Sequence, residues 1–181
     1  EDIPLIDKYE AYQLLDDDWT EIAVDLEIIQ TEGTEAIKKV DPLMVTKKKA
    51  GKEQEVQDGW KGHIIPFELV QNTILSEEKE RIKAQENRLS EIASEYEEIF
   101  DSLTEEEKGF DFVSEDGWVI SEVKRALKSD SIELETKEKL ETIAKIDDEE
   151  KSLKAEIKTK SASLETKTKD IIENLSDEQA S

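Results

Sequence analysis

Residues 134–175 read LETKEKLETIAKIDDEEKSLKAEIKTKSASLETKTKDIIENL and contain neither glycine nor proline. From Leu140 onward one set of large apolar residues follows in steps of three, four or seven, which keeps them on one narrow stripe of an α-helix. The apolar residues that mark the predicted helix are Leu134, Leu140, Ile143, Ile146, Leu153, Ile157, Leu164, Ile171 and Leu175. Because so narrow a stripe cannot form a globular core alone, the sequence predicts a long helix that packs against another helix.

A second helix is predicted over residues 76–103 by a heptad pattern. Its seven-residue repeat is Leu75, Ile82, Leu89, Tyr96 and Leu103, with Ile92 and Ile99 at the alternating position. The economical arrangement is an antiparallel helical hairpin, similar to a coiled coil, between this helix and the longer one. Since the 76–103 helix is the shorter, part of the longer stripe is left without a partner in this chain. An interface with another subunit is therefore predicted at Ile146, Leu153, Ile157, Leu164, Ile171 and Leu175.

Residues 104–130 interrupt this helical hairpin. Thr104 and Glu107 have the spacing of a capping box, which predicts the start of a short helix. An aromatic segment at 109–120 follows as a break, and a short helix is predicted over 121–128. A second cap signal, Asp130 with Glu133, then opens the long helix. With residues 76–181 as one helical extension, the sequence predicts a mainly α protein.

Residues 1–75 form the other predicted part, which is helical with a small β-hairpin. Helical spacing extends over 5–32, although the acidic run at 16–18 could divide it into two helices, and a further turn is predicted over 34–40. The change of composition over about 43–66 predicts a β-hairpin that turns near residues 50–51, with room for a third short strand around Ile64. A helix is expected to begin just past Pro66 and to extend to Leu75.

The charge balance limits the function of the chain. Its 48 acidic and 25 basic residues give a formal net charge of −23, and charged residues make up 40% of the sequence. Nucleic-acid affinity depends on clustered Lys and Arg that neutralise phosphates, so direct binding of DNA over the whole surface is disfavoured. No apolar run reaches the roughly 20 residues of a membrane helix, no signal peptide opens the chain, and cysteine is absent. We expect a cytoplasmic protein, and the start at Glu1 without Met predicts a fragment of a longer one.

No residue pattern predicts a catalytic, cofactor-binding or metal site in this chain. His63, the only histidine, lacks companion ligands and is interpreted as a structural residue beside Trp60. The carboxylates at 16–18 point in different directions on a helix and are interpreted as a solvated face. Trp19, Trp60 and Trp118 are interpreted as core residues. The one basic cluster is Lys47, Lys48, Lys49 and Lys52, which is either a soluble hairpin tip or a phosphate contact made within a larger assembly.

Five phrases of the sequence resemble the C-terminal region of the methylation subunit of type I restriction-modification systems. They are residues 4–19 (PLIDKYEAYQLLDDDW), 25–33 (DLEIIQTEG), 59–67 (GWKGHIIPF), 89–98 (LSEIASEYEE) and 173–179 (ENLSDEQ). The resemblance spans nearly the whole chain and rests on the order of these phrases, since the chain holds no catalytic signature of the family.

The resemblance implies that the complete parent protein is an S-adenosylmethionine-dependent DNA methyltransferase acting on N6 of adenine. Its catalytic and cofactor motifs belong to a preceding domain, so no catalytic or cofactor residue is carried over to this chain. The implied partners are a specificity subunit, a second methylation subunit and a restriction subunit, with DNA contacted only indirectly. In this family the C-terminal helices pack against helical spacers of the specificity subunit, which is the partner expected for the unpaired stripe.

Other classes of function remain open at this point. The net charge of −23 suits an acidic DNA mimic that inhibits a nucleic-acid enzyme. The helical pattern also suits a coiled-coil adaptor without any association with a methyltransferase. An autonomous enzyme is a further class, and it predicts turnover or cofactor binding by the chain itself.

Overall fold

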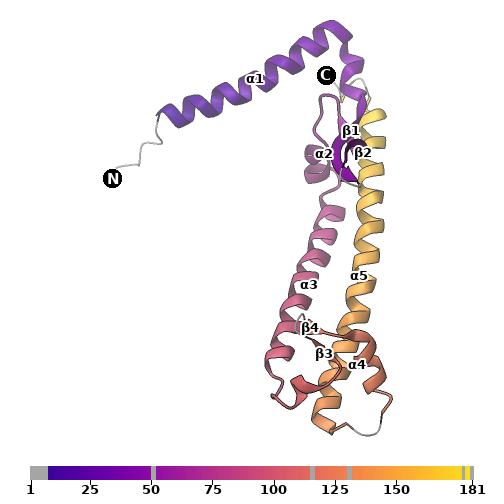
Figure 1. Cartoon of the computed structure of the whole chain (residues 1–181). Helices are drawn as coiled ribbons and strands as arrows, with labels where there is room; N and C mark the ends of the chain where they lie inside the picture. The colour runs from indigo at the N-terminus through magenta and orange to yellow at the C-terminus, as the bar shows by residue number, and fades with distance from the viewer. Residues whose placement is uncertain (1–7, 50–51, 115–116, 130–131, 177, 180–181) are drawn as a thin grey trace. The chain divides into compact units, whose positions relative to one another are not determined.

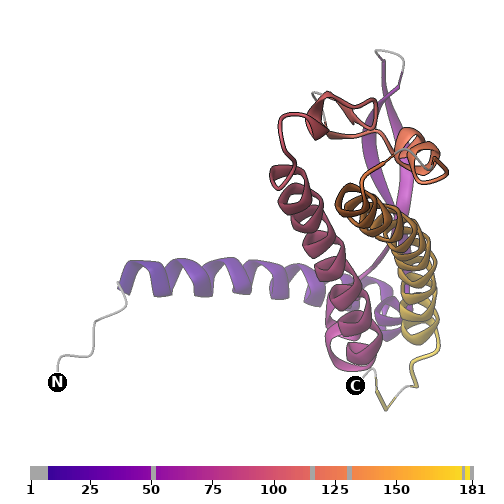
Figure 2. The same ribbon diagram turned by 90° about the horizontal axis from the view of Figure 1, so that it is seen from below.

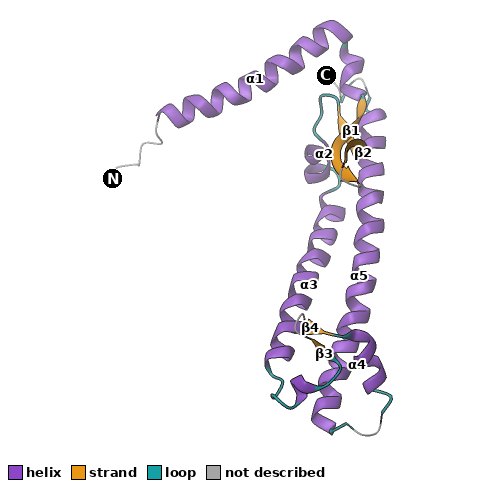
Figure 3. Cartoon of the chain, in the orientation of Figure 1, coloured by secondary structure: helices purple, strands orange, loops and turns teal. Residues whose placement is uncertain are grey.

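The computed structural model describes residues 8–49, 52–114, 117–129, 132–176 and 178–179, and the chain is mainly helical (Figure 1, Figure 3). It divides into two compact units. One, here called the N-terminal unit, combines Glu1–Ser76 with Leu164–Ser181, and the other, the helical-hairpin unit, is Glu77–Ser163. The predicted fold class is confirmed, with an N-terminal helix, a β-hairpin and a long C-terminal helix that packs against a second helix.

The N-terminal unit begins with helix α1 (Lys8–Glu32), followed by the 3-10 helix η1 (Thr34–Lys38). The prediction of a helix over 5–32 is confirmed for the residues that the structure describes, and residues 5–7 lie outside them. The division considered at 16–18 does not occur, since α1 is one continuous helix from Lys8 to Glu32. Gly33 separates the two helices with a φ of 82°, a left-handed conformation that glycine adopts without a steric penalty.

Strands β1 (Val40–Lys49) and β2 (Lys52–Gly62) form the antiparallel hairpin. It begins and ends a few residues earlier than the predicted range of 43–66, and the turn predicted near residues 50–51 lies outside the described residues. The register shifts between Pro42 and Met44. A proline is tolerated here because both strands of a two-stranded sheet are edge strands.

The third strand considered around Ile64 is absent from the described residues, and that prediction is wrong. Pairing with β1 ends at Gly62, and residues 63–65 form a bend. The bend folds so closely over Gly62 that a Cβ atom there would lie 1.8 Å from the backbone oxygen of Ile65. This turn redirects the chain into helix α2 (Phe67–Thr73), which was predicted over 67–75.

The C-terminal end of α5 (Leu134–Glu173) belongs to the N-terminal unit. Its buried side chains are Leu164, Thr168 and Ile172. The Glu165 carboxylate accepts a hydrogen bond from the Trp60 backbone N–H at 2.8 Å, and the Lys169 ammonium lies 3.5 Å from the centroid of the Trp60 ring. Here α5 therefore meets the β-hairpin, and its buried face need not follow the heptad of a two-helix seam. This accounts for the burial of Ile172 where the sequence stripe placed Ile171.

In the helical-hairpin unit, α3 (Ser76–Asp101) lies beside α5 (Figure 1, Figure 2). The prediction of two long helices that pack together is confirmed. Buried apolar side chains come from both, namely Ile82 and Ile92 of α3 and Leu140, Ile143 and Ile146 of α5. Asp130, the predicted cap of α5, lies outside the described residues. Leu134 departs from the stripe, since it is 75% exposed at the beginning of the helix.

The connection between the two long helices is built around the predicted capping box, which is confirmed. The Thr104 backbone N–H donates to the Glu107 carboxylate at 2.7 Å, and the Glu107 N–H donates to the Thr104 hydroxyl at 3.2 Å. The elements that follow are η2 (Glu107–Gly109), the short strands β3 (Val113–Ser114) and β4 (Gly117–Trp118), and α4 (Ile120–Ala126). The strands were not predicted. Phe112 and Val123 of this connection join Leu140 and Ile143 of α5 in one buried cluster.

Candidate partner-binding surface

Helix α1 carries a row of exposed apolar side chains. Trp19 is 65% exposed, Ile22 49% and Leu26 48%. Their spacing of three and four residues places them on one side of the helix, and we call them the α1 apolar row. Val24 is 52% exposed but lies on the opposite side. An apolar row of this kind is stabilised when a partner covers it.

Trp19 was predicted to be a core residue, and that prediction is wrong. In the sequence a tryptophan on a helical stripe indicates burial, but the spacing does not reveal whether the burial occurs within the chain or against another one. Trp60 and Trp118 are partly buried, and both make contacts within their own units. The α1 apolar row is therefore a surface that sequence reasoning missed, although its helical spacing was recognised.

The C-terminal end of α1 is tied to the base of the β-hairpin by charged groups. The Lys39 ammonium lies 2.5 Å from the Glu32 carboxylate. His63 lies with Nδ1 2.7 Å from the Asp41 carboxylate and with Nε2 3.5 Å from Glu32, the latter as an ion-pair contact without hydrogen-bond geometry. The hydrogen bond to Asp41 raises the pKa of His63 above its usual value, although partial burial opposes the shift. His63 thus has a structural role, as the sequence indicated: it lies in the bend after β2 and contacts Glu32 of α1 and Asp41 of β1.

The predicted interface residues of α5 differ in exposure. Ile146 and Leu164 are buried within their own units, at 4% and 8% exposure. The other four, Leu153, Ile157, Ile171 and Leu175, are partly buried. Ile146 and Leu164 therefore stabilise the fold directly, whereas the other four retain some surface that a partner could cover.

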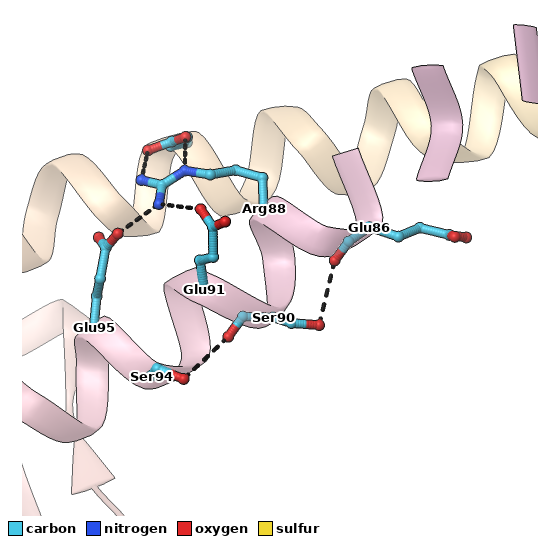
Figure 4. A network of polar contacts seen from close by, with 7 residues as sticks. Glu86, Arg88, Ser90, Glu91, Ser94 and Glu95 are labelled. Carbon is cyan, nitrogen blue, oxygen red and sulfur yellow. Dashed lines mark hydrogen bonds and ion pairs between the residues drawn. The ribbon is translucent and has the colours of Figure 1, made fainter. Parts of the chain in front are cut away.

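Arg88 of α3 fixes the pairing of the two long helices (Figure 4). Its guanidinium forms a bidentate contact with the Glu149 carboxylate of α5, in which Nε donates at 2.7 Å and Nη2 donates at 3.0 Å. Nη1 reaches Glu95 and Glu91 on its own helix, at 2.5 and 3.3 Å. These carboxylates, with Glu149 first, raise the pKa of Arg88, and the guanidinium lowers the pKa of Glu149. Because such geometry suits only one relative position of the helices, it adds register specificity to the apolar seam.

The predicted phosphate-contact lysines lie along the hairpin. Lys47 is 2.9 Å from the Asp58 carboxylate on the facing strand. Lys48 and Lys52 are exposed, and the side chain of Lys49 lies outside the described part of the chain. Lys48 pairs in register with Glu53, so acidic side chains of β2 accompany the basic ones. That these lysines contact phosphate stays a prediction.

Among the described side chains, no group of three or more His, Cys, Asp or Glu is placed to hold a metal ion. None of the described helices combines the length and the apolar character that crossing a membrane requires. No protein-family model, curated protein or solved structure matches this chain.

Proposed function

We propose that this chain is the C-terminal assembly region of a type I methylation subunit and that it docks to helices of the specificity subunit. The observation that carries the proposal is the α1 apolar row: Trp19 and Leu26 lie in two of the segments that resemble this family, and Ile22 lies between these segments. An amphipathic helix that lays its apolar side against a partner is a common recognition mode, and Trp is among the residues that dominate such interfaces. The specificity subunit would cover Trp19, Ile22 and Leu26.

The net charge of the chain supports an assembly in which another subunit contacts the DNA. With a net charge of −23, the surface repels DNA phosphates, so the partner subunit would read the DNA. The parent protein would methylate adenine N6 with S-adenosylmethionine bound in a preceding domain, and a second methylation subunit and a restriction subunit would complete the complex. The partly buried side chains of α5, such as Ile157, would add to the contact.

The test is a binding titration between the full chain and a purified specificity subunit of a type I system, measured by calorimetry. Ile22→Asp and Leu26→Asp place a charge in the apolar row and are expected to weaken binding by at least about tenfold each, since each large apolar side chain contributes about 1.5–3 kcal/mol when covered. Val24→Asp introduces the same charge on the opposite side of α1 and is the matched control. Ile157→Asp tests the contribution of α5.

The outcomes separate the alternatives. Absence of a complex with the unmodified chain would refute the proposal, and equal losses in Val24→Asp and Ile22→Asp would remove the α1 apolar row from it. An acidic DNA mimic would instead compete with DNA for a nucleic-acid enzyme, and the competition would weaken as salt increases. Heat on titration with S-adenosylmethionine would favour an enzyme.

A further inference from the structure

A hollow in the helical-hairpin unit combines aromatic and acidic walls. Its volume is about 620 Å³, within the range of ligand-binding pockets. The aromatic lining residues are Tyr96, Phe100 and Trp118, and the acidic ones are Glu97, Asp101, Asp147 and Glu150. They come from α3, β4 and α5, all within Glu77–Ser163. We call this hollow the aromatic–acidic pocket.

The aromatic wall is held in place by its neighbours. The Trp118 indole N–H donates to the backbone oxygen of Tyr96 at 3.1 Å. The Phe100 ring meets Trp118 edge to face, with centroids 5.9 Å apart, and Phe112 stacks on Trp118 at 6.4 Å. Because these contacts come from several directions, the rings keep their orientation without a ligand. A ligand that binds here loses little free energy to ordering the site.

The acidic side of the pocket has both paired and unpaired carboxylates. Asp147 is buried and accepts contacts from Lys124 at 2.9 Å and Lys151 at 2.7 Å. Glu150 pairs with Lys154 and accepts a hydrogen bond from the Tyr96 hydroxyl at 3.3 Å.

Glu97 and Asp101 are exposed on α3, and neither has an ion-pair partner among the residues that the structure describes. Burial, followed by the nearby charges of Glu150 and Asp147, raises the pKa of Tyr96 well above its usual value. The pocket is therefore a negative site in which the unpaired carboxylates lie at an open rim.

We propose that the aromatic–acidic pocket binds the side chain of an arginine from a partner protein. A guanidinium is planar, so it stacks on aromatic rings and at the same time donates two parallel hydrogen bonds to a carboxylate. The rim carboxylates repel anionic groups and give neutral donors only a weaker hydrogen bond than a guanidinium receives. A lysine ammonium, which is compact and strongly hydrated, uses the aromatic wall less well. The net charge of −23 also draws basic segments toward the chain. This inference does not rest on the proposed function.

The test uses the full chain and the capped peptide acetyl-Gly-Arg-Gly-amide, followed by the indole N–H signals in nuclear magnetic resonance. The three tryptophans give three signals, and Trp19→Phe and Trp60→Phe variants identify the signal of Trp118. Saturable movement of the Trp118 signal, with the other two unchanged, is expected with the arginine peptide. The citrulline peptide, which has the same shape without the charge, is expected to bind several-fold more weakly, as is the lysine peptide.

Substitutions of the two rim carboxylates test whether their negative charges contribute to binding. Glu97→Gln and Asp101→Asn are each expected to weaken binding by about two- to fivefold, the range of an exposed ion pair. Glu98→Gln is the matched control, because Glu98 neighbours Glu97 on α3 but does not line the pocket. Unchanged backbone spectra verify that each variant is folded. Equal binding of the citrulline and arginine peptides would overturn the proposal, and so would an equal loss in Glu98→Gln or the absence of any Trp118 shift.

Discussion

Glu107 is the carboxylate on which the connection between the two long helices depends, and its replacement by Gln gives a quantitative test. Its side chain is only 10% exposed and accepts hydrogen bonds from the Thr104 backbone N–H, from the Thr136 hydroxyl at 2.9 Å and from the Lys139 ammonium at 3.1 Å. Burial alone would raise the pKa of Glu107, but these donors outweigh it and lower the pKa from 4.5 to about 2. The charged form is therefore the one that the folded state favours.

The magnitude follows from the linkage between protonation and folding. A carboxylate whose pKa falls from 4.5 to about 2 on folding stabilises the protein by about 3 kcal/mol at neutral pH. This stabilisation is fully present above the unfolded-state pKa and is lost as the pH falls toward the folded-state value; about 1.4 kcal/mol of it is gone at about pH 3.5. Glu107→Gln, which cannot ionise, should lose up to the full amount at neutral pH. The difference in the free energy of unfolding between Glu107→Gln and the unmodified protein should then become smaller as the pH falls.

Urea unfolding followed by far-ultraviolet circular dichroism measures this difference. With a urea dependence of about 2 kcal/mol per molar, the midpoint for Glu107→Gln should fall by about 1.5 M at neutral pH. Glu106→Gln is the matched control, because Glu106 is an exposed neighbour and its replacement should shift the midpoint little. A loss below about 1 kcal/mol, or one that stays constant from neutral pH to about pH 3.5, would refute the reasoning.

Three further predictions concern other parts of the fold. Leu140→Ala removes a fully buried side chain and should lower the free energy of unfolding by about 2–5 kcal/mol, measured by urea titration. Gly62→Ala places a Cβ atom 1.8 Å from a backbone oxygen and should cost about 1–3 kcal/mol in the same assay, whereas Gly109→Ala, with no atom within 4 Å, should cost far less. The imidazole of His63 should titrate with a pKa above about 6.5 in a nuclear magnetic resonance experiment, and Asp41→Asn should lower the pKa of His63. Because the pKa of His63 is raised on folding, its stabilisation is complete below about pH 6.5 and is lost as the pH rises through the folded value; a His63→Gln variant should lack this dependence.

Much of the helical architecture could be predicted because its signals are local. The heptad that contains Ile82 and the stripe through Leu140 and Ile143 depend only on helical periodicity, and the Thr104–Glu107 box depends on a three-residue spacing. The two-residue strands β3 and β4 are too short to show an alternating pattern, so they were missed. The continuity of α1 through 16–18 shows that a charge run alone does not end a helix.

The surfaces were harder to predict, because exposure depends on what lies opposite a side chain in space. The same spacing that places Ile143 in a core places Trp19 in solvent. The burial of Ile172 instead of Ile171 depends on packing against the β-hairpin, and no spacing within α5 reveals this packing. The aromatic–acidic pocket gathers Tyr96, Trp118 and Glu150 from three separate segments, and its only sequence signal was the concentration of aromatic residues at 109–120.

The discontinuous composition of the N-terminal unit sets an order on its formation during protein synthesis. Its buried residues Leu164 and Ile172 are translated after the whole of Glu77–Ser163, which takes a ribosome roughly 4 to 17 s at common elongation rates. The helical-hairpin unit is continuous in sequence and can therefore fold as it leaves the ribosome. The β-hairpin, which is translated earlier, lacks its contact between Trp60 and Glu165 until α5 is complete. A chain released before Leu164 would retain all residues of the helical-hairpin unit and would leave the N-terminal unit without this part of its core.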